Sequence, residues 1–503
     1  MYDKRLEQIE RWRITGTIRT ESPLHIGDGD RLPLLQRDCH IPEPMKRGLG
    51  KAEYASVLVD AGEQPMIPAT SLKGALRGWA TAHGLEERLI RQVFGDTGEK
   101  ETDPGRGMVT FYDARLIAVA DTWNTEFRFW STKRRTVLTP QVAIDPLTRS
   151  AKEHLLYYVE YVPAGAEFQL AMTAQNATEP QRGFLLSILE QAFQSTGRPC
   201  RLGSETANGW GKAQWTLDRV EVMGMPEMAV WLAKSASTWT DGLRELKDGE
   251  KSGWLAAGTR VASARRDQTL GLKLQLQFSG PVLINDPTQQ RKAEDDGQNA
   301  VGHAMIRRED GQVFLPAQSV RGAFRAQARR IWQTLAWESA EGLNALAAFD
   351  RMFGATGWRT PVEVGSFSLD GQGAPHAQEF VAVDRFTGGA AKEKKFRADG
   401  LLKPSFRGEI TIRLDRWAKA KVGPWAWLLL AYTLRDWIEG DGVLGYGASK
   451  GYGAFRAAVE VSGESKEADL LRGVLARKAT ALEDPALEQW ERSLRELFGK
   501  EAA

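Results

Sequence analysis

Alternating apolar and polar residues predict a strand at two places far apart in the chain. Residues 272–278 read Leu-Lys-Leu-Gln-Leu-Gln-Phe, and residues 14–18 read Ile-Thr-Gly-Thr-Ile. A period of two is typical of a half-buried strand, because successive side chains point to opposite faces of a sheet. Each run is therefore expected to start a sheet that has one face in a hydrophobic core.

Helical spacing of apolar residues follows each of these strands. Leu72, Leu76 and Trp79 fall on one helix face, and Ser71, like Ser319 further along, can cap a helix start. Second helices are expected over residues 181–194 and 425–439. The tail after residue 463 predicts one or two amphipathic helices, interrupted at Pro485.

The order of these elements repeats along the chain. Residues 68–77 (Pro-Ala-Thr-Ser-Leu-Lys-Gly-Ala-Leu-Arg) match residues 316–325 (Pro-Ala-Gln-Ser-Val-Arg-Gly-Ala-Phe-Arg). Other pairs follow in the same order: 23–27 with 281–285, 94–98 with 353–357, 142–145 with 381–384, and 202–211 with 444–453. Collinear repeats of this kind indicate a duplicated module.

Two copies of a strand–helix–strand–strand–helix–strand order predict an α+β fold of two tandem RRM-like, ferredoxin-like modules with loop insertions. The expected boundaries are 1–222 for the first module, 223–265 for a helical connector, 266–462 for the second module and 463–503 for a helical tail. A chain of 503 residues is long enough for two such cores.

Composition narrows the class of protein. The net charge is +2, so binding to nucleic acid would need local clusters of cations. The two cysteines, Cys39 and Cys200, form neither a disulfide framework nor a zinc motif. The N-terminus has no apolar signal region, and no apolar run is long enough to span a membrane. These features favour a cytoplasmic protein with no membrane contact.

The duplicated helix start combines a hydroxyl with cations. Backbone N–H groups and the helix dipole at such a start attract an anion, and cations one turn apart add full charges. A phosphate contact is therefore predicted twice, against the alternative of an ordinary cap with solvated cations. The candidate residues are Ser71, Lys73, Arg77, Ser319, Arg321 and Arg325.

Two further segments are candidates for RNA contact. Glycine-rich loops at Gly209, Gly211, Lys450, Gly451 and Gly453 would let the backbone approach a phosphate closely, although a tight hairpin with an inward aromatic explains them equally well. They lack the Gly-Lys-[Ser/Thr] ending of a Walker loop, and they lead into strands. Residues 127–135 mix aromatics with the cations Lys133, Arg134 and Arg135, a pattern suited to single-stranded RNA or to a half-buried strand with a basic end.

No Ser/His/Asp or Cys/His arrangement stands out as a nucleophile with its base. Asp38 lies 11 residues after Gly27, and Asp296 lies 11 residues after the matching Asn285. Both fall in the variable loop before the duplicated helix start. A lone carboxylate in a loop is usually solvated, so position alone gives only a weak case for catalysis.

These motifs together resemble the RAMP superfamily of CRISPR-associated proteins, most closely the backbone subunits of type III effector complexes. The resemblance rests on His25-Ile-Gly27, Ser71–Arg77, Val383-Asp-Arg-Phe-Thr-Gly388 and both glycine loops. It covers nearly all of both modules and leaves out the connector and the tail. The first copy departs from the family pattern with Asp145-Pro146, and the second with Asn285.

The resemblance implies an RRM-like fold with a protruding thumb, packed side by side with other effector subunits along a guide RNA (crRNA). It implies cleavage of the complementary target RNA supported by a loop aspartate and a divalent cation such as Mg²⁺. Asp38 and Asp296 are the candidates, with Asp28, Asp30, Asp286 and Asp295 as nearby alternatives.

Three other functions stay open from the sequence. The chain could be a non-catalytic RNA-binding scaffold of the same complex, or a guide-processing endoribonuclease. It could also be an enzyme that binds a small phosphate compound with duplicated domains. His25 belongs to a turn motif, which weighs against the processing enzyme.

Overall fold

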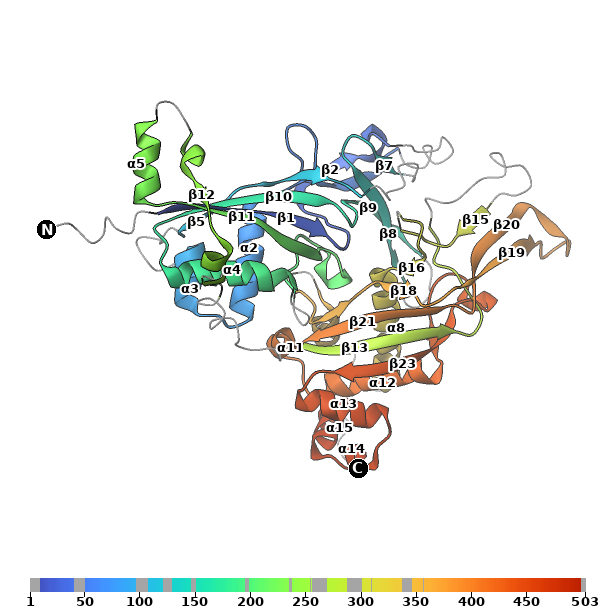
Figure 1. Ribbon diagram of the computed structural model, residues 1–503. Helices are drawn as coiled ribbons and strands as arrows, with labels where there is room; N and C mark the ends of the chain where they lie inside the picture. The colour runs from blue at the N-terminus through green and yellow to red at the C-terminus, as the bar shows by residue number, and fades with distance from the viewer. Residues whose placement is uncertain are drawn as a thin grey trace.

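A computed structural model shows two modules side by side, each a sheet with helices on one face (Figure 1). The structure describes residues 10–39, 50–95, 107–120, 129–145, 151–194, 199–234, 238–253, 255, 269–286, 301–308, 310–336, 346–355 and 357–498. Two large hydrophobic cores, one in each module, hold most of the buried apolar side chains of these residues, and a smaller cluster is formed by Leu34, Tyr54, Phe129, Leu138 and Tyr158.

The main sheet of the first module is built around β1 (Arg11–Thr20). Buried and partly exposed side chains alternate along β1, as the sequence pattern predicts. Antiparallel neighbours flank β1 on both sides. The order along the sheet is β12 (Arg244–Glu245), β11 (Ala213–Met223), β1, β10 (Glu167–Gln175), β6 (Ala114–Ala118) and β4 (Met66–Ile67), with β5 (Val109–Phe111) also paired to β10.

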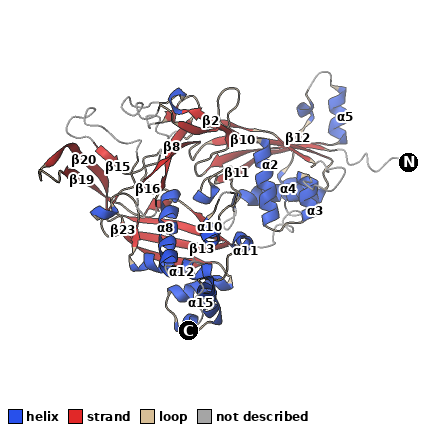
Figure 2. Ribbon diagram, turned by 180° about the vertical axis from the view of Figure 1, so that it is seen from behind, coloured by secondary structure: helices blue, strands red, loops and turns tan. Residues whose placement is uncertain are grey.

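Helices cover one face of this sheet (Figure 2). They are α2 (Ala69–Ala82), α3 (Glu87–Phe94) and α4 (Glu179–Gln194). Leu72 and Leu76 of α2 are fully buried, and Trp79 is nearly so, which confirms the predicted helix face. The order β1–α2–β6–β10–α4–β11, with β11 and β10 beside β1, is that of a ferredoxin-like module.

The second module repeats this arrangement. Its sheet runs β16 (Phe314–Leu315), β18 (Phe367–Leu369), β21 (Ser405–Arg413), β13 (Thr269–Phe278), β23 (Ala454–Ser462) and β22 (Gly442–Val443), with β17 (Val362–Val364) paired to β21. Its helices are α8 (Ala317–Leu335), α10 (Leu346–Phe353), α11 (Leu414–Ala420) and α12 (Trp425–Glu439). The predicted fold of tandem ferredoxin-like modules is therefore confirmed.

Each module also carries a smaller sheet that ends in a long hairpin. In the first module its strands are β2 (Gly27–Pro33), β3 (Glu53–Val57), β7 (Trp130–Ser131), β8 (Thr136–Ile144) and β9 (Ala151–Tyr161). In the second they are β14 (Pro281–Val282), β15 (Val301–Ala304), β19 (Ala374–Val383) and β20 (Ala390–Leu402). The β8–β9 hairpin reaches toward the second module, whereas the β19–β20 hairpin projects outward (Figure 1).

The connector and the tail add further helices to the two modules. In the connector, α5 (Met225–Ala233) stands off the body of the molecule and precedes the short helix η4 (Trp239–Gly242) (Figure 1). The tail forms α13 (Lys466–Leu475), α14 (Ala479–Leu482) and α15 (Pro485–Leu497). Pro485 begins α15 directly after its cap Asp484, because proline suits the first helical position.

Candidate nucleic-acid interface

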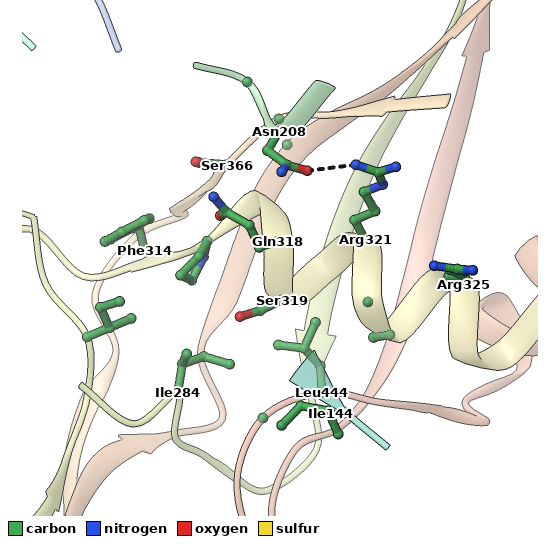
Figure 3. Close-up of a pocket in the computed structure, with 18 of the residues that line it drawn as sticks. Ile144, Asn208, Ile284, Phe314, Gln318, Ser319, Arg321, Arg325, Ser366 and Leu444 are labelled. Atoms are coloured by element: carbon green, nitrogen blue, oxygen red, sulfur yellow. Dashed lines mark hydrogen bonds between the residues drawn. The ribbon is translucent and has the colours of Figure 1, made fainter. Parts of the chain in front are cut away.

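The glycine loop of the first module fastens the two modules together. Residues 206–208 form a short helix, η3, between Glu205 and Gly209, which both have positive φ. The Asn208 side-chain oxygen accepts a hydrogen bond from Arg321 of α8 at 3.1 Å (Figure 3). Arg359 donates to the hydroxyl of Thr206. Both contacts join the first module to the second, so this loop acts as an intermodule clasp.

A buried carboxylate lies behind this clasp. Glu363 of β17 is only 6 % exposed. Its carboxylate forms ion pairs with the guanidinium groups of Arg416 and Arg413, at N–O distances of 2.8 and 3.2 Å. Burial alone would raise its pKa, but the charges of Arg413, Arg416 and Arg201 hold the pKa of Glu363 below its usual value. Glu363 is therefore ionised and neutralises cations from both modules.

A groove of about 2790 Å³ runs between the modules. Its walls are the β8–β9 hairpin, both glycine loops and one face of α8, and Ile144, Ser319 and Leu444 are among the residues that line it (Figure 3). Basic residues outnumber acidic ones along its lining. The basic residues are Lys212, Lys273, Arg307, Arg308, Arg321, Arg325, Arg329, Arg330, Arg407 and Lys450, and the acidic ones are Glu21, Asp145, Glu205, Asp286, Glu409, Asp441 and Glu460.

The two duplicated helix starts have different surroundings. In the second module, Ser319, Arg321 and Arg325 all line the groove, and Arg325 also pairs with Asp350 at 2.7 Å (Figure 3). In the first module, the backbone N–H of Ala69 donates to the Asp113 carboxylate at 2.8 Å, so that helix start already has an anion. Ser71, Lys73 and Arg77 follow on α2, away from the groove lining.

The glycines of both loops have a structural reason to be glycine. Gly209, Gly211, Gly451 and Gly453 all have positive φ. A Cβ on Gly211 would lie 1.9 Å from the carbonyl oxygen of Leu202, and one on Gly453 would lie 2.2 Å from that of Leu444. The aromatics between them pack inward: Trp210 is 6 % exposed and Tyr452 is 1 % exposed. The tight-hairpin alternative therefore describes the local structure of both loops.

The basic segment at residues 133–135 is the turn between β7 and β8. The Arg134 guanidinium is buried and donates to the Tyr54 hydroxyl and to the Val57 carbonyl oxygen at 3.0 and 3.1 Å. Lys133 pairs with Glu63 at 2.6 Å, and Arg135 is exposed. Arg134 thus holds the smaller sheet together, and Arg135 is the cation of this turn most open to a ligand.

Asp38 lies exposed beside this same turn. Its carboxylate accepts hydrogen bonds from the Thr132 hydroxyl at 3.3 Å and from the Lys133 N–H at 3.2 Å. The preceding Arg37 is fully buried against Glu160 and donates to Thr136. Because Arg37 is held by Glu160, the position of the next residue, Asp38, is fixed as well. Sequence reasoning missed Glu160, whose one signal is a carboxylate within the apolar run Tyr-Tyr-Val-Glu-Tyr-Val.

The other candidate carboxylates have separate surroundings, except that Asp28 and Asp30 are joined by a hydrogen bond. Asp28 accepts from the Ser56 hydroxyl at 2.7 Å and from the Asp30 N–H at 2.9 Å. Asp286 is buried at the groove wall. Asp295 and Asp296 lie outside the described residues.

A divalent cation at Asp38 would need oxygen ligands in addition to this one carboxylate. Within the described ranges, no group of three or more His, Cys, Asp or Glu side chains could hold a metal ion. Mg²⁺ is, however, commonly held by one or two carboxylates together with substrate phosphates. The exposed Asp38 fits that mode, because its two hydrogen bonds are long and its oxygens stay accessible.

Fold and groove define a protein of tandem ferredoxin-like modules that share a basic channel. Comparison with known families then gives a match to the RAMP superfamily over residues 17–214 and 300–456, and the chain belongs to this superfamily. Membership supports a CRISPR-associated RNA-binding role, with CRISPR RNA and effector subunits as partners in general. No curated protein matches the chain. In the described part of the chain, no helix is long and apolar enough to cross a membrane.

Proposed function

We propose that this chain is a guide-RNA-binding backbone subunit of a type III CRISPR effector complex. The observation that carries the proposal is the basic groove, because residues from both modules line it and basic residues outnumber acidic ones there. One chain would then hold two successive stretches of guide RNA. Purification of the chain from cells that express a CRISPR array should recover guide RNA of defined length, whereas random cellular RNA would contradict the proposal.

The same proposal includes cleavage of the paired target RNA. Asp38 would hold a divalent cation such as Mg²⁺ together with an RNA phosphate, and Asp296 would do so in the second module. The cation would stabilise negative charge that develops on the phosphate. A thumb that interrupts guide–target pairing would splay the target RNA, so that a 2′-hydroxyl is oriented for in-line attack on its own phosphate while the 5′-oxygen of the next nucleotide leaves.

Substitution in the assembled complex tests this assignment. Asp38→Ala and Asp296→Ala should each abolish one set of cleavage products, while guide RNA stays bound. Asp60→Asn is the matched control and should leave the products unchanged, since Asp60 lies in the same module, accepts hydrogen bonds from the N–H groups of Gly62 and Gln64, and is not a catalytic candidate. Unchanged products in both Ala variants would favour the non-catalytic scaffold. Shortened guide RNA that depends on this chain would favour the processing enzyme.

A neighbouring effector subunit is the proposed partner of the outward hairpin. The β8–β9 hairpin lies over the second module, but the matching β19–β20 hairpin projects away from the described elements of both modules (Figure 1). Phe386 at that tip is 99 % exposed, and the Asp384 carboxylate fixes the turn through the N–H groups of Phe386 and Thr387. A rigid turn with an exposed aromatic suits contact with another protein.

Phe386→Ser tests this contact. Because the ring is exposed, we expect the free energy of unfolding to change by less than about 0.5 kcal/mol. Association with the rest of the effector complex should weaken by about tenfold, as measured by pull-down with increasing subunit concentration. Exposed Leu482 lies on α14, in the tail, so Leu482→Ser is the control and should leave association unchanged.

A further inference from the structure

The glycine loop of the second module has the backbone of the clasp but different side chains. Its short helix η7 (Ala448–Lys450) lies between Gly447 and Gly451, both with positive φ, as η3 does between Glu205 and Gly209. In this match, Tyr446 takes the place of Ser204 and Lys450 the place of Asn208. Asn208 binds the neighbouring module, so Lys450 stands where a partner contact is made in the first copy.

Aromatic rings gather around Lys450. Its ammonium lies 4.7 Å from the ring centre of Phe380, 5.1 Å from that of Phe396 and 4.9 Å from that of Tyr446. It also donates to the Tyr446 hydroxyl at 2.9 Å. These rings are half-buried, whereas Lys450 itself is exposed. A flexible lysine therefore lies over a partly open aromatic surface.

His303 extends this surface from β15. Its ring lies 4.5 Å from that of Tyr446 and 5.1 Å from that of Phe396. Its buried Nδ1 has no hydrogen-bond partner among the described residues. Burial lowers the pKa of His303, and the charge of Lys450 lowers it further, so the imidazole is neutral at neutral pH. A neutral imidazole offers one donor and one acceptor.

Among its described residues, the first module keeps only one ring of this cluster, Tyr157 at the position of Phe396. Phe380 pairs across the hairpin with Phe396, and the matching pair in the first module is Gln141 with Tyr157. Ala55 has the strand position of His303. The full cluster around a lysine is therefore found in the second copy, whose loop has Lys450 where the first has the clasp residue Asn208.

We propose that this cluster (His303, Phe380, Phe396, Tyr446 and Lys450) is a stacking site for one unpaired nucleobase of a bound RNA strand. Lys450 covers the rings in the free protein and moves to the adjacent phosphate when the base enters. Tyr446 and Lys450 also line the basic groove, so a strand in the groove reaches the site directly. The ammonium disfavours a cationic protein side chain as the occupant and favours a base with its phosphate.

This inference rests on the RNA-binding function proposed above, and the experiment separates the two. Equilibrium binding of a single-stranded RNA to the full chain is measured for wild type, Tyr446→Leu, Phe396→Leu and Lys450→Met. Loss of either ring should weaken binding by about tenfold, the size of one base–aromatic contact. Lys450→Met should lower the salt dependence of binding by about 0.7 in slope, the share of one phosphate.

Tyr432→Leu on α12 is the control, because Tyr432 is partly exposed and lies away from the groove lining. In parallel, 4-thiouridine placed at successive RNA positions should crosslink to the Tyr446 peptide from one position only. Wild-type binding that Tyr446→Leu leaves unchanged would overturn the inference and keep the proposed function. A wild-type chain that binds no RNA overturns both. Weakened binding to a protein subunit alone assigns the cluster to a protein partner, and the inference fails.

Discussion

The carboxylate of Glu363 illustrates at the scale of one residue how the modules are joined. It is buried with Arg413 and Arg416 and lies in the field of Arg201 from the other module. Removal of one partner from a buried ion pair leaves the charge of the other partner buried without compensation. The resulting loss of stability is larger than the stability that the intact pair contributes. Glu363 therefore matters to stability although it is not among the residues that line the groove between the modules.

Glu363→Gln should lower the free energy of unfolding at pH 7 by about 3–5 kcal/mol. Because the folded-state pKa of Glu363 lies below its usual 4.5, its contribution is present above about pH 4.5 and is lost as the pH falls through the folded pKa. The gap between wild type and variant should therefore narrow at pH 4, as measured by urea denaturation. Glu460→Gln, in an exposed pair 3.9 Å from Lys273, should cost less than about 1 kcal/mol. Equal losses in both variants would contradict this account.

Single residues also show what the sequence could and could not predict. The alternation along β13 and the bounds of α12 follow from local periodicity, and the structure agrees with both. The bond between Asn208 and Arg321 joins positions 113 residues apart and has no local signal. Likewise, Asp113 caps α2, while its counterpart Asp370 accepts from Gln275 and Arg407 instead. Identical motifs thus acquired different partners through tertiary packing.

At the scale of elements, the two glycine loops raise the question of why glycine is needed. It can be required by the backbone conformation and close packing, or it can let a ligand approach the backbone. Gly211 and Gly451 both have positive φ, but only Gly211 has no space for a Cβ. Gly451→Ala should cost about 1 kcal/mol of conformational strain. Gly211→Ala must also displace the Leu202 carbonyl, so its loss of stability should be clearly larger in thermal denaturation. If the two variants unfold alike, contact with Leu202 does not fix the loop.

Divergence between the copies belongs to this scale as well. Each loop keeps its backbone, but the first binds α8 through Asn208 and the second gathers aromatic rings around Lys450. Sequence comparison finds the shared glycines readily, since they are set by φ. The different contacts of the two loops depend on which elements pack against each loop, and the sequence alone does not show this packing.

At the scale of the whole molecule, the net charge is only +2, but the groove between the modules is lined by more basic than acidic residues. Binding of a single strand should therefore weaken with salt, with a slope of about −0.7 for each phosphate that the groove neutralises. Arg307 is exposed at the groove, and Arg325 lines it from α8. Arg307→Ala and Arg325→Ala should each lower both the affinity and the steepness of the salt dependence.

Titrations of RNA binding at several salt concentrations measure these slopes. Arg435→Ala is the matched control, because Arg435 pairs with Glu439 on α12 and lies outside the groove lining. We expect its slope to equal that of wild type. If all three variants lose the same slope, RNA is attracted by the overall charge and not by the groove. If only the groove variants change, the channel shared by the two modules is the path of the RNA, and the duplication serves to make it continuous.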